Sequence, residues 1–221
     1  MMKVIQQKPK RGRPPKSTHD HQDTKQALIR SGVELITERG YMTADIDSIL
    51  KRVGIPKGSF YYYFENKEAF GHAILENYAS YFAHKLNKYL NNQTISPLER
   101  IYQFYLDAKQ GMEKYHFNRG CLVGNLGQEI STIPHSFRQR LNEIFLDWQH
   151  CIANCLTEAQ LNGDIAQSLN SQTLAYSFWI GWEGAVMRAK LIKNAEPMTI
   201  FINYFLNNLD YKPNLGTDHS H

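Results

Sequence analysis

Cysteine is scarce in this chain of 221 residues, and the sequence lacks any apolar run of the roughly 20 residues needed to cross a membrane. The three cysteines, Cys121, Cys151 and Cys155, are few and odd in number, which argues against a disulfide framework and favours a reducing compartment. The first residues are basic and rich in proline, unlike an apolar signal peptide. We therefore expect a cytoplasmic protein without a membrane partner.

Motifs of catalysis and metal binding are also missing. The sequence contains no Gly-x-Ser-x-Gly element, no phosphate-binding loop, and no CxxC or HxxxH pair. Cys151 and Cys155 stand four residues apart without further ligands, so we expect no metal site. We expect no cofactor and no enzymatic activity. The alternative from another class is a cysteine-dependent hydrolase that pairs Cys121 with His116 or His135.

The net charge of +4 is unevenly distributed along the chain. Residues 1–67 hold 13 basic and 7 acidic side chains, a net charge of +6, whereas residues 68–221 hold 12 basic and 14 acidic ones, a net charge of −2. A polyanionic partner is therefore expected at the N-terminal part. The hydrophobic content of 42% is enough to bury one substantial core or two small ones.

Residues 43–67 predict two short helices joined by a tight turn. Apolar residues recur at steps of three and four over residues 46–53, which places them on one helix face. Gly54 suits the left-handed conformation that ends helices, and Pro56 suits the start of the next helix. This spacing is typical of a helix-turn-helix, whose second helix enters the DNA major groove. The alternative is an amphipathic helix pair with an aromatic core and a solvated face.

The second of these helices carries side chains suited to nucleic acid. Lys57 offers a charge for phosphate, Gly58 permits close backbone approach, and Ser59 can hydrogen-bond a base edge or a phosphate. The three tyrosines 61–63 are unusual on so short a helix, and one of them must face inward. Lys67 follows at the start of the next helix, where backbone amides also favour an anion.

The string GIPKGSFYYYFENKEAF resembles the recognition-helix signature of TetR-family transcriptional repressors, and the resemblance extends over RGYMTADIDSILKRVGIPKGSFYYYFENK. It implies an all-α fold of about nine helices, with a three-helix DNA-binding headpiece and a helical body that binds a ligand and dimerises. The DNA contacts it implies are Thr43, Lys57, Gly58, Ser59, Tyr61, Tyr62, Tyr63 and Lys67, with Ser59 reading a base. The family usually has a Thr-Thr or Thr-Ser pair where this sequence has Ala44-Asp45; Asp45 can cap the helix, but its charge repels phosphate.

The expected organisation has four parts. Residues 1–20 form a basic, disordered arm, residues 21–67 the headpiece with a first helix at 23–39, residues 68–211 the body, and residues 212–221 a disordered tail. The arm is either a solubilising tail or a minor-groove arm, because its Lys10, Arg11 and Arg13 resemble the short core of an AT-hook.

In the body, GCLVGNLGQE and FWIGWEGAVMRAK resemble one branch of the TetR family, the repressors that respond to acrylate-like or other electrophilic metabolites. The resemblance implies that Cys121 is the sensor thiol and that Lys190 lies near it. Cys121 also follows Arg119 at an expected helix start, and a helix N-terminus or a nearby cation lowers a thiol pKa. Three interpretations of Cys121 are open: a covalent sensor, the wall of a non-covalent pocket, or an inert core residue.

Other residues of the body complete the expected effector site. Arg119 or Arg188 would hold a carboxylate, and Tyr105, Trp179 and Trp182 would wall a small cavity beside Glu183. The expected function is a repressor that binds a palindromic operator in double-stranded DNA as a homodimer and is released by a small effector. The alternative is a regulator of the same type with a non-covalent hydrophobic ligand.

Overall fold

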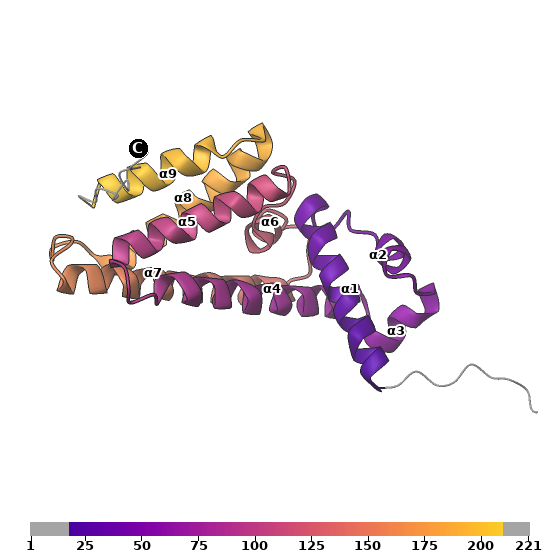
Figure 1. The fold of residues 1–221 in the computed structure, drawn as a ribbon. Coiled ribbons are helices and arrows are strands. Elements are labelled where there is room, and N and C mark those ends of the chain that lie inside the picture. The colour runs from indigo at the N-terminus through magenta and orange to yellow at the C-terminus, as the bar shows by residue number, and fades with distance from the viewer. Residues whose placement is uncertain (1–17, 210–221) are drawn as a thin grey trace, which may run out of the picture.

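The computed structural model describes residues 18–209, and this part of the chain is entirely helical (Figure 1). Nine α-helices and one short 3-10 turn follow one another in it: α1 Thr18–Arg39, α2 Ile46–Val53, η1 Lys57–Ser59, α3 Phe60–Tyr63, α4 Lys67–Leu90, α5 Pro97–Lys114, α6 Leu122–Gln128, α7 Ser136–Leu161, α8 Ser171–Ile192 and α9 Glu196–Asn207. The all-α prediction is confirmed. None of these helices is long and apolar enough to cross a membrane.

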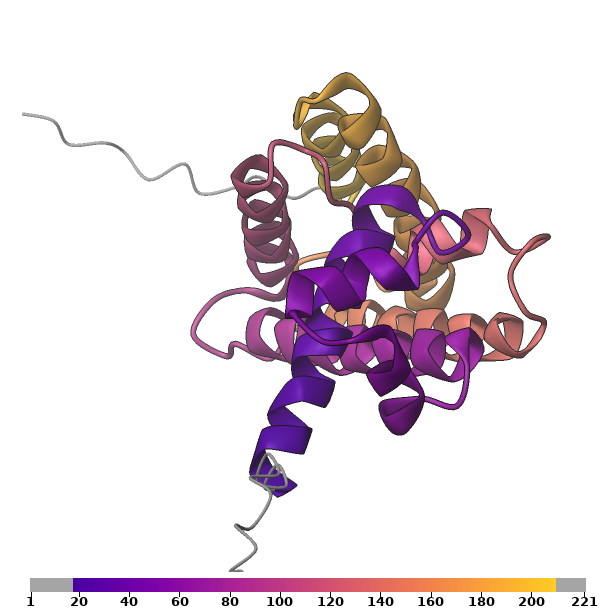
Figure 2. The ribbon, with the colours of Figure 1, turned by 90° about the vertical axis from the view of Figure 1, so that its right-hand side faces the viewer.

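The helices are arranged as a small headpiece and a larger body (Figure 1). The headpiece consists of α1, α2, η1 and α3, and the body of α4 to α9. Helix α4 joins the two parts, because it packs against α1 and also against α5 and α7. In Figure 2, which looks at the molecule from the headpiece side, α1 crosses in front of the body.

Local sequence signals set the ends of the headpiece helices. Asp45 caps α2, as expected, by accepting backbone hydrogen bonds of 3.1 and 3.2 Å. Gly54 ends α2 in the left-handed region at φ +75°. Asn66 caps α4 by accepting a hydrogen bond of 2.8 Å from the amide of Ala69. The turn between the two motif helices is therefore fixed by short-range contacts.

Two details of the headpiece differ from the expectation. α1 begins at Thr18 rather than at residue 23, and so takes in residues 18–20, which were expected to belong to the arm. No helix breaker stands in this stretch, and His21 packs on Tyr62 with ring centroids 4.9 Å apart. The second motif helix opens as a 3-10 turn after Pro56. The predicted arm contacts Lys10, Arg11 and Arg13, and the tail 212–221, lie outside the described residues.

Aromatic side chains from α4, α5, α7 and α8 fill the core of the body. The ring of Phe82 lies 4.3 Å from that of Trp148, which lies 5.1 Å from that of Trp179. At the far end of this core, the buried guanidinium of Arg100 on α5 forms a 2.7 Å ion pair with Glu158 on α7. These contacts make the body a rigid frame on which the headpiece is mounted.

Candidate functional site

The short helix of the headpiece exposes the side chains that the sequence pattern assigned to DNA. Tyr61 and Tyr62 are 67% and 69% exposed, and Lys57 is exposed beside them. The opposite side of this helix packs into the headpiece through Phe60 and Phe64, which are buried. The order of the three tyrosines follows from this packing, because the third, at position 63, faces the side of α1 and is half-buried.

Gly58 lies on the same exposed surface without a structural reason for being glycine. A Cβ at this position would meet nothing within 4 Å, and its backbone is not in the left-handed region. Ser59 is half-buried at the end of the 3-10 turn. An open glycine on a tyrosine-rich, lysine-bearing surface suits the close approach of another molecule's backbone.

Three of the predicted DNA-contacting residues, Lys57, Thr43 and Lys67, also contact other residues of the headpiece. The Lys57 ammonium lies 2.7 Å from the carboxylate of Asp47, which raises the pKa of this lysine. The Thr43 hydroxyl donates to the Arg39 carbonyl. Lys67 is half-buried over the ring of Tyr41, 4.9 Å from its centroid, and burial lowers its pKa. Lys67 is thus the least available of the predicted set.

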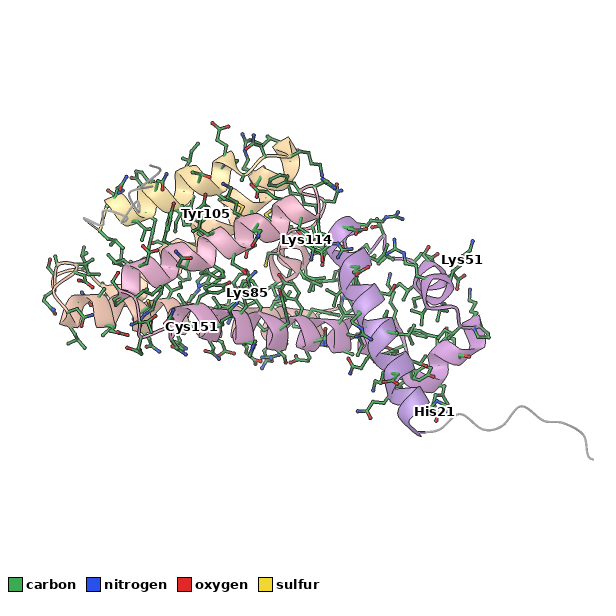
Figure 3. All side chains as sticks on the ribbon, viewed as in Figure 1. His21, Lys51, Lys85, Tyr105, Lys114 and Cys151 are labelled. Carbon is green, nitrogen blue, oxygen red and sulfur yellow. The ribbon has the colours of Figure 1, made fainter. Side chains whose placement is uncertain are left out.

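A cavity of about 460 Å³ opens where the headpiece meets the body, between α1, α4, α5 and α8. Three residues of the predicted effector site line it, namely Cys121, Arg119 and Trp182. Sequence reasoning missed other lining residues, among them Tyr78, Lys85 and Arg30. Lys85 extends from α4 toward α5, where it pairs with Asp107 (Figure 3). The only sequence signal of these missed lining residues was their helical spacing, which does not distinguish the wall of a cavity from a buried core or a solvated face.

Five residues of the predicted effector site do not line this cavity. Tyr105 is buried with its hydroxyl 2.7 Å from that of Thr199, and Trp179 belongs to the aromatic core. Arg188 is exposed on the face of α8 that turns toward α9. The Glu183 carboxyl lies beside Cys121 and Gly124, and the Lys190 ammonium donates to the Thr37 carbonyl at 3.0 Å. These placements correct the expected site, because helix packing turns the residues away from the cavity.

Cys121 caps α6 and is only 6% exposed. Its sulfur accepts a 3.4 Å hydrogen bond from the amide of Gly124, the contact expected at a helix start. Burial, reinforced by the Glu183 carboxylate, nevertheless raises the pKa of the thiol well above its usual value. The expected lowering of this pKa is wrong, since Arg119 is paired with Glu38 at 3.0 Å instead of facing the sulfur.

The carboxylate of Glu183 is buried beside this thiol. Its Oε1 has no hydrogen-bond partner, and burial raises the pKa of the carboxyl to about 7, an effect that the Cys121 thiol moderates. A Cβ at Gly124 would overlap the other carboxylate oxygen, so the glycine makes room for it. Tyr78 faces the same point from α4, and burial raises the pKa of its hydroxyl.

The segment 119–129, which contains Cys121, also forms polar contacts with the headpiece. The Glu129 carboxylate accepts hydrogen bonds from the backbone amides of Tyr41 and Met42, both at 3.0 Å. The Asn125 amide donates to the Thr37 carbonyl at 3.0 Å, near the end of α1. Hydrogen bonds of this one segment thus connect the neighbourhood of Cys121 with the end of α1 and with the turn before α2.

The outer faces of α8 and α9 carry many exposed apolar side chains. This surface, called the α8–α9 face here, consists of Tyr176, Ile180, Met187, Leu191, Ile192, Ile200 and Tyr204. Contiguous exposed apolar surface on a folded protein marks an interaction site.

A short exposed helix that follows a capped one is the arrangement with which helix-turn-helix proteins read DNA. The adjoining cavity of about 460 Å³ has a volume in the range of small-molecule sites. Residues 28–74 match the family described as bacterial regulatory proteins, tetR family, and residues 97–205 match the tetracyclin repressor-like C-terminal domain. The chain belongs to the TetR family of DNA-binding transcriptional repressors. The cysteine-dependent hydrolase is thereby set aside.

Individual relatives resemble the chain over most of its length. The transcriptional regulator AcuR of Cereibacter sphaeroides is 44% identical over 201 residues, which cover 91% of each chain. The crystal structure of a regulatory protein TetR from Rhodobacter sphaeroides, also 44% identical, has a TM-score of 0.81 and covers 82% of this chain and 96% of its own. The structure of E. coli NemR, reduced form, is 26% identical, has a TM-score of 0.75 and covers 84% of this chain and 96% of its own.

Proposed function

We propose that this repressor binds a palindromic operator as a homodimer and releases it when a small, acrylate-like electrophile adds to Cys121. The observation that carries the proposal is the position of Cys121, which lines the cavity while its own segment holds the headpiece through Glu129. The relative E. coli NemR lends support, because its crystal structure is described as that of a reduced form, a distinction of redox state.

The DNA side of the proposal rests on the exposed surface of η1 and α3. Tyr61 and Tyr62 would donate hydroxyl hydrogen bonds in the major groove, while Lys57 exchanges Asp47 for a phosphate. Gly58 would let the DNA backbone approach, and Ser59 would reach a base edge or phosphate. Tyr63, Thr43 and Lys67 would act mainly by fixing this surface, because their polar groups are partly engaged.

The homodimer would form through the α8–α9 face. Packing the α8–α9 faces of two chains together buries apolar side chains that are exposed in one copy, in a four-helix interface. Such a symmetric pair presents two recognition helices, which must lie roughly 34–36 Å apart to enter successive major grooves. A change in the angle of the headpieces would therefore release the operator.

The effector side rests on the chemistry of the cavity. Its volume of about 460 Å³ suits a small molecule. Arg30, Lys85 and Arg119 line the cavity together with one acid, Glu34. Because Lys85 is paired with Asp107, and Arg119 with Glu34 and Glu38, Arg30 is the lining cation that would attract a ligand carboxylate, while Cys121 offers a thiol at the cavity wall. Arg188 and Lys190 act elsewhere, at the α9 side and at the α1 carbonyls.

A non-covalent apolar ligand is the second candidate for the effector. The raised pKa of the Cys121 thiol favours it, because a protonated thiol is a weak nucleophile. Apolar lining residues such as Phe82, Met112 and Val186 would contact such a ligand. In that case the effector would act by binding the released state more tightly than the operator-bound state.

The test is a gel shift on the DNA that flanks the protein's own gene, titrated with acrylate, a quinone and a saturated carboxylate such as propionate. We expect a specific protein–DNA complex that dissociates when acrylate or the quinone is added and that persists when propionate is added. Release by propionate at the same concentration would favour the non-covalent ligand. A protein that forms no specific complex with this DNA or with selected palindromic sites would contradict the DNA side of the proposal.

Glu129 gives a prediction about how the signal travels. In Glu129→Ala, two backbone amides of the headpiece lose a charged acceptor, so the body would control the headpiece less tightly. We expect the ratio of operator affinities without and with acrylate to fall by about tenfold, within the usual range of coupling energies. Fluorescence anisotropy on labelled operator measures both affinities. Gln128→Ala, at the neighbouring position, is the control, and a ratio equal to that of wild type would reject this route.

The basic arm gives a prediction about salt. Removing residues 1–16 takes away the basic side chains that precede α1. If they bind phosphates, the slope of log affinity against log salt should become shallower by about 0.9 for each phosphate that is no longer neutralised. Anisotropy titrations between roughly 50 and 200 mM salt measure the slope. Removal of 212–221 is the control, and an unchanged slope would leave the arm as a solubilising tail.

A further inference from the structure

The side chain of Glu183 ends in a buried carboxylate that no cation neutralises in the described part of the chain. The residue is half-buried as a whole, but its Oε1 is fully buried and makes no hydrogen bond. Among the described residues, no lysine, arginine or histidine forms an ion pair with it. Gly124 leaves the space that the carboxylate occupies, since a Cβ there would overlap it. A buried carboxylate without a cationic partner, in space that a glycine leaves open, needs an explanation.

The groups that face this carboxylate come from two helices. Cys121, at the start of α6, is close enough for the thiol and the carboxyl to alter each other's pKa. Tyr78, on α4, lies close enough to Cys121 and Glu183 for both of them to raise the pKa of its hydroxyl. The nearby cations are engaged elsewhere: Arg119 with Glu34 and Glu38, and Lys190 with backbone carbonyls at the end of α1.

We propose that Glu183 is the base that accepts the proton of the Cys121 thiol when the sulfur adds to the β-carbon of an α,β-unsaturated carbonyl compound in the cavity. The inference rests on the proposed function and deepens it, because it names the group that makes a buried, protonated thiol reactive. Cys121 lines the cavity whereas Glu183 does not, so an acceptor in the cavity and the base can both lie near the sulfur without competing for the same space.

The step balances without an outside reagent. As the sulfur–carbon bond forms, the carbon–carbon π bond breaks and its electron pair moves onto the carbonyl as an enolate. The thiol proton passes to Glu183. The enolate carbon then takes a proton from Glu183, either directly or through a water molecule that gives up one proton and takes that of Glu183, which leaves a thioether and restores the carboxylate. The neutral Tyr78 hydroxyl is placed to donate a hydrogen bond to the developing negative charge on sulfur.

The titration behaviour of the pair supports this assignment. Burial raises the pKa of Glu183 to about 7, so a substantial part of the carboxyl is ionised near neutral pH. A base with a pKa near the working pH is the most effective kind. The thiol alone, with a pKa raised well above its usual value, would supply very little thiolate there. Addition should therefore become faster as pH rises through about 7 and then level off.

A purely electrostatic role for Glu183 predicts the opposite result in a mutant. Its negative charge raises the pKa of the thiol. If Glu183 did nothing else, replacing it by glutamine would lower that pKa and speed the addition. If Glu183 is the base, the same replacement slows the addition. The sign of the change in rate thus separates the two roles.

The experiment follows the addition of acrylamide and of acrylate to the full-length protein by intact-mass spectrometry between about pH 5.5 and 9.5, a range that spans the Glu183 titration. In Glu183→Gln we expect the rate near pH 7.5 to fall at least about tenfold and the inflection near pH 7 to disappear. Glu113→Gln, an exposed acid at the end of α5, should react like wild type. An equal or faster rate in Glu183→Gln, or a wild-type Cys121 that does not react, would overturn the proposal.

A second variant keeps the test decisive if Glu183→Gln folds poorly. Gly124→Ala leaves the carboxyl intact but forces it out of its space, so it should also slow the addition; an unchanged rate in folded Gly124→Ala would count against Glu183. Anisotropy on operator DNA with the modified wild-type protein separates this inference from the proposed function. Modified protein that still binds DNA refutes the effector role of Cys121 and leaves the chemical role of Glu183 standing.

Discussion

Cys121→Ser is expected to abolish operator release by acrylate-type electrophiles while leaving operator affinity within about twofold of wild type. Effector coupling in regulators of this kind is typically about 5- to 150-fold in affinity, and we expect the variant to retain less than about twofold. The reason is chemical, because a serine hydroxyl does not add to an electrophilic alkene under conditions in which a thiol does. The measurement is an anisotropy titration of labelled operator at increasing acrylate.

The substitution is mild for the fold, which makes this test sharp. Cys121 is the N-cap of α6 and its sulfur accepts the hydrogen bond of the Gly124 amide. Serine is among the preferred N-cap residues and has nearly the same shape, so α6 should begin at the same place. Cys151→Ser, which alters a half-buried cysteine on α7, is the matched control. Release that survives unchanged in Cys121→Ser would establish the non-covalent ligand instead.

The double variant Lys57→Ala/Tyr62→Ala is expected to weaken operator binding by about 100-fold or more. Each polar side chain removed from a protein–DNA interface costs about 1–3 kcal/mol, and in a dimer each is removed twice. Stability should change little, because the Lys57 side chain is 73% exposed and Tyr62 is 69% exposed.

Lys88→Ala removes the same charge from an exposed position on α4, far from the headpiece, and should leave operator affinity within about twofold. Thermal unfolding should match wild type in both variants. If the double variant binds operator as tightly as the Lys88→Ala control, the exposed face of η1 and α3 is not the recognition surface.

The headpiece was predictable because its signals are local. Gly54 and Asp45 set the ends of α2 by themselves, and the alternation of Phe60 and Phe64 with exposed tyrosines follows helix geometry. The 3-10 turn at 57–59 was not predicted, because nothing in the sequence separates such a turn from the first turn of an α-helix.

The region around Cys121 was predictable only in part because its geometry depends on distant residues. Cys121 and Trp182 line a cavity, but whether an aromatic or charged residue on a helix faces that cavity is decided by packing. Glu129 contacts Tyr41, 88 residues away, and no periodicity announces such a contact. The pKa of the thiol was expected to fall and instead rises, because its burial and the position of Glu183 are tertiary facts.

The most direct measurement is the operator affinity of wild-type protein modified once at Cys121 by acrylate, with the modification verified by intact mass. If addition to Cys121 releases the operator, this adduct binds labelled operator at least about tenfold more weakly than unmodified protein in the same buffer, and Cys121→Ser treated in the same way is unchanged. An adduct that binds operator as tightly as unmodified protein would contradict the account.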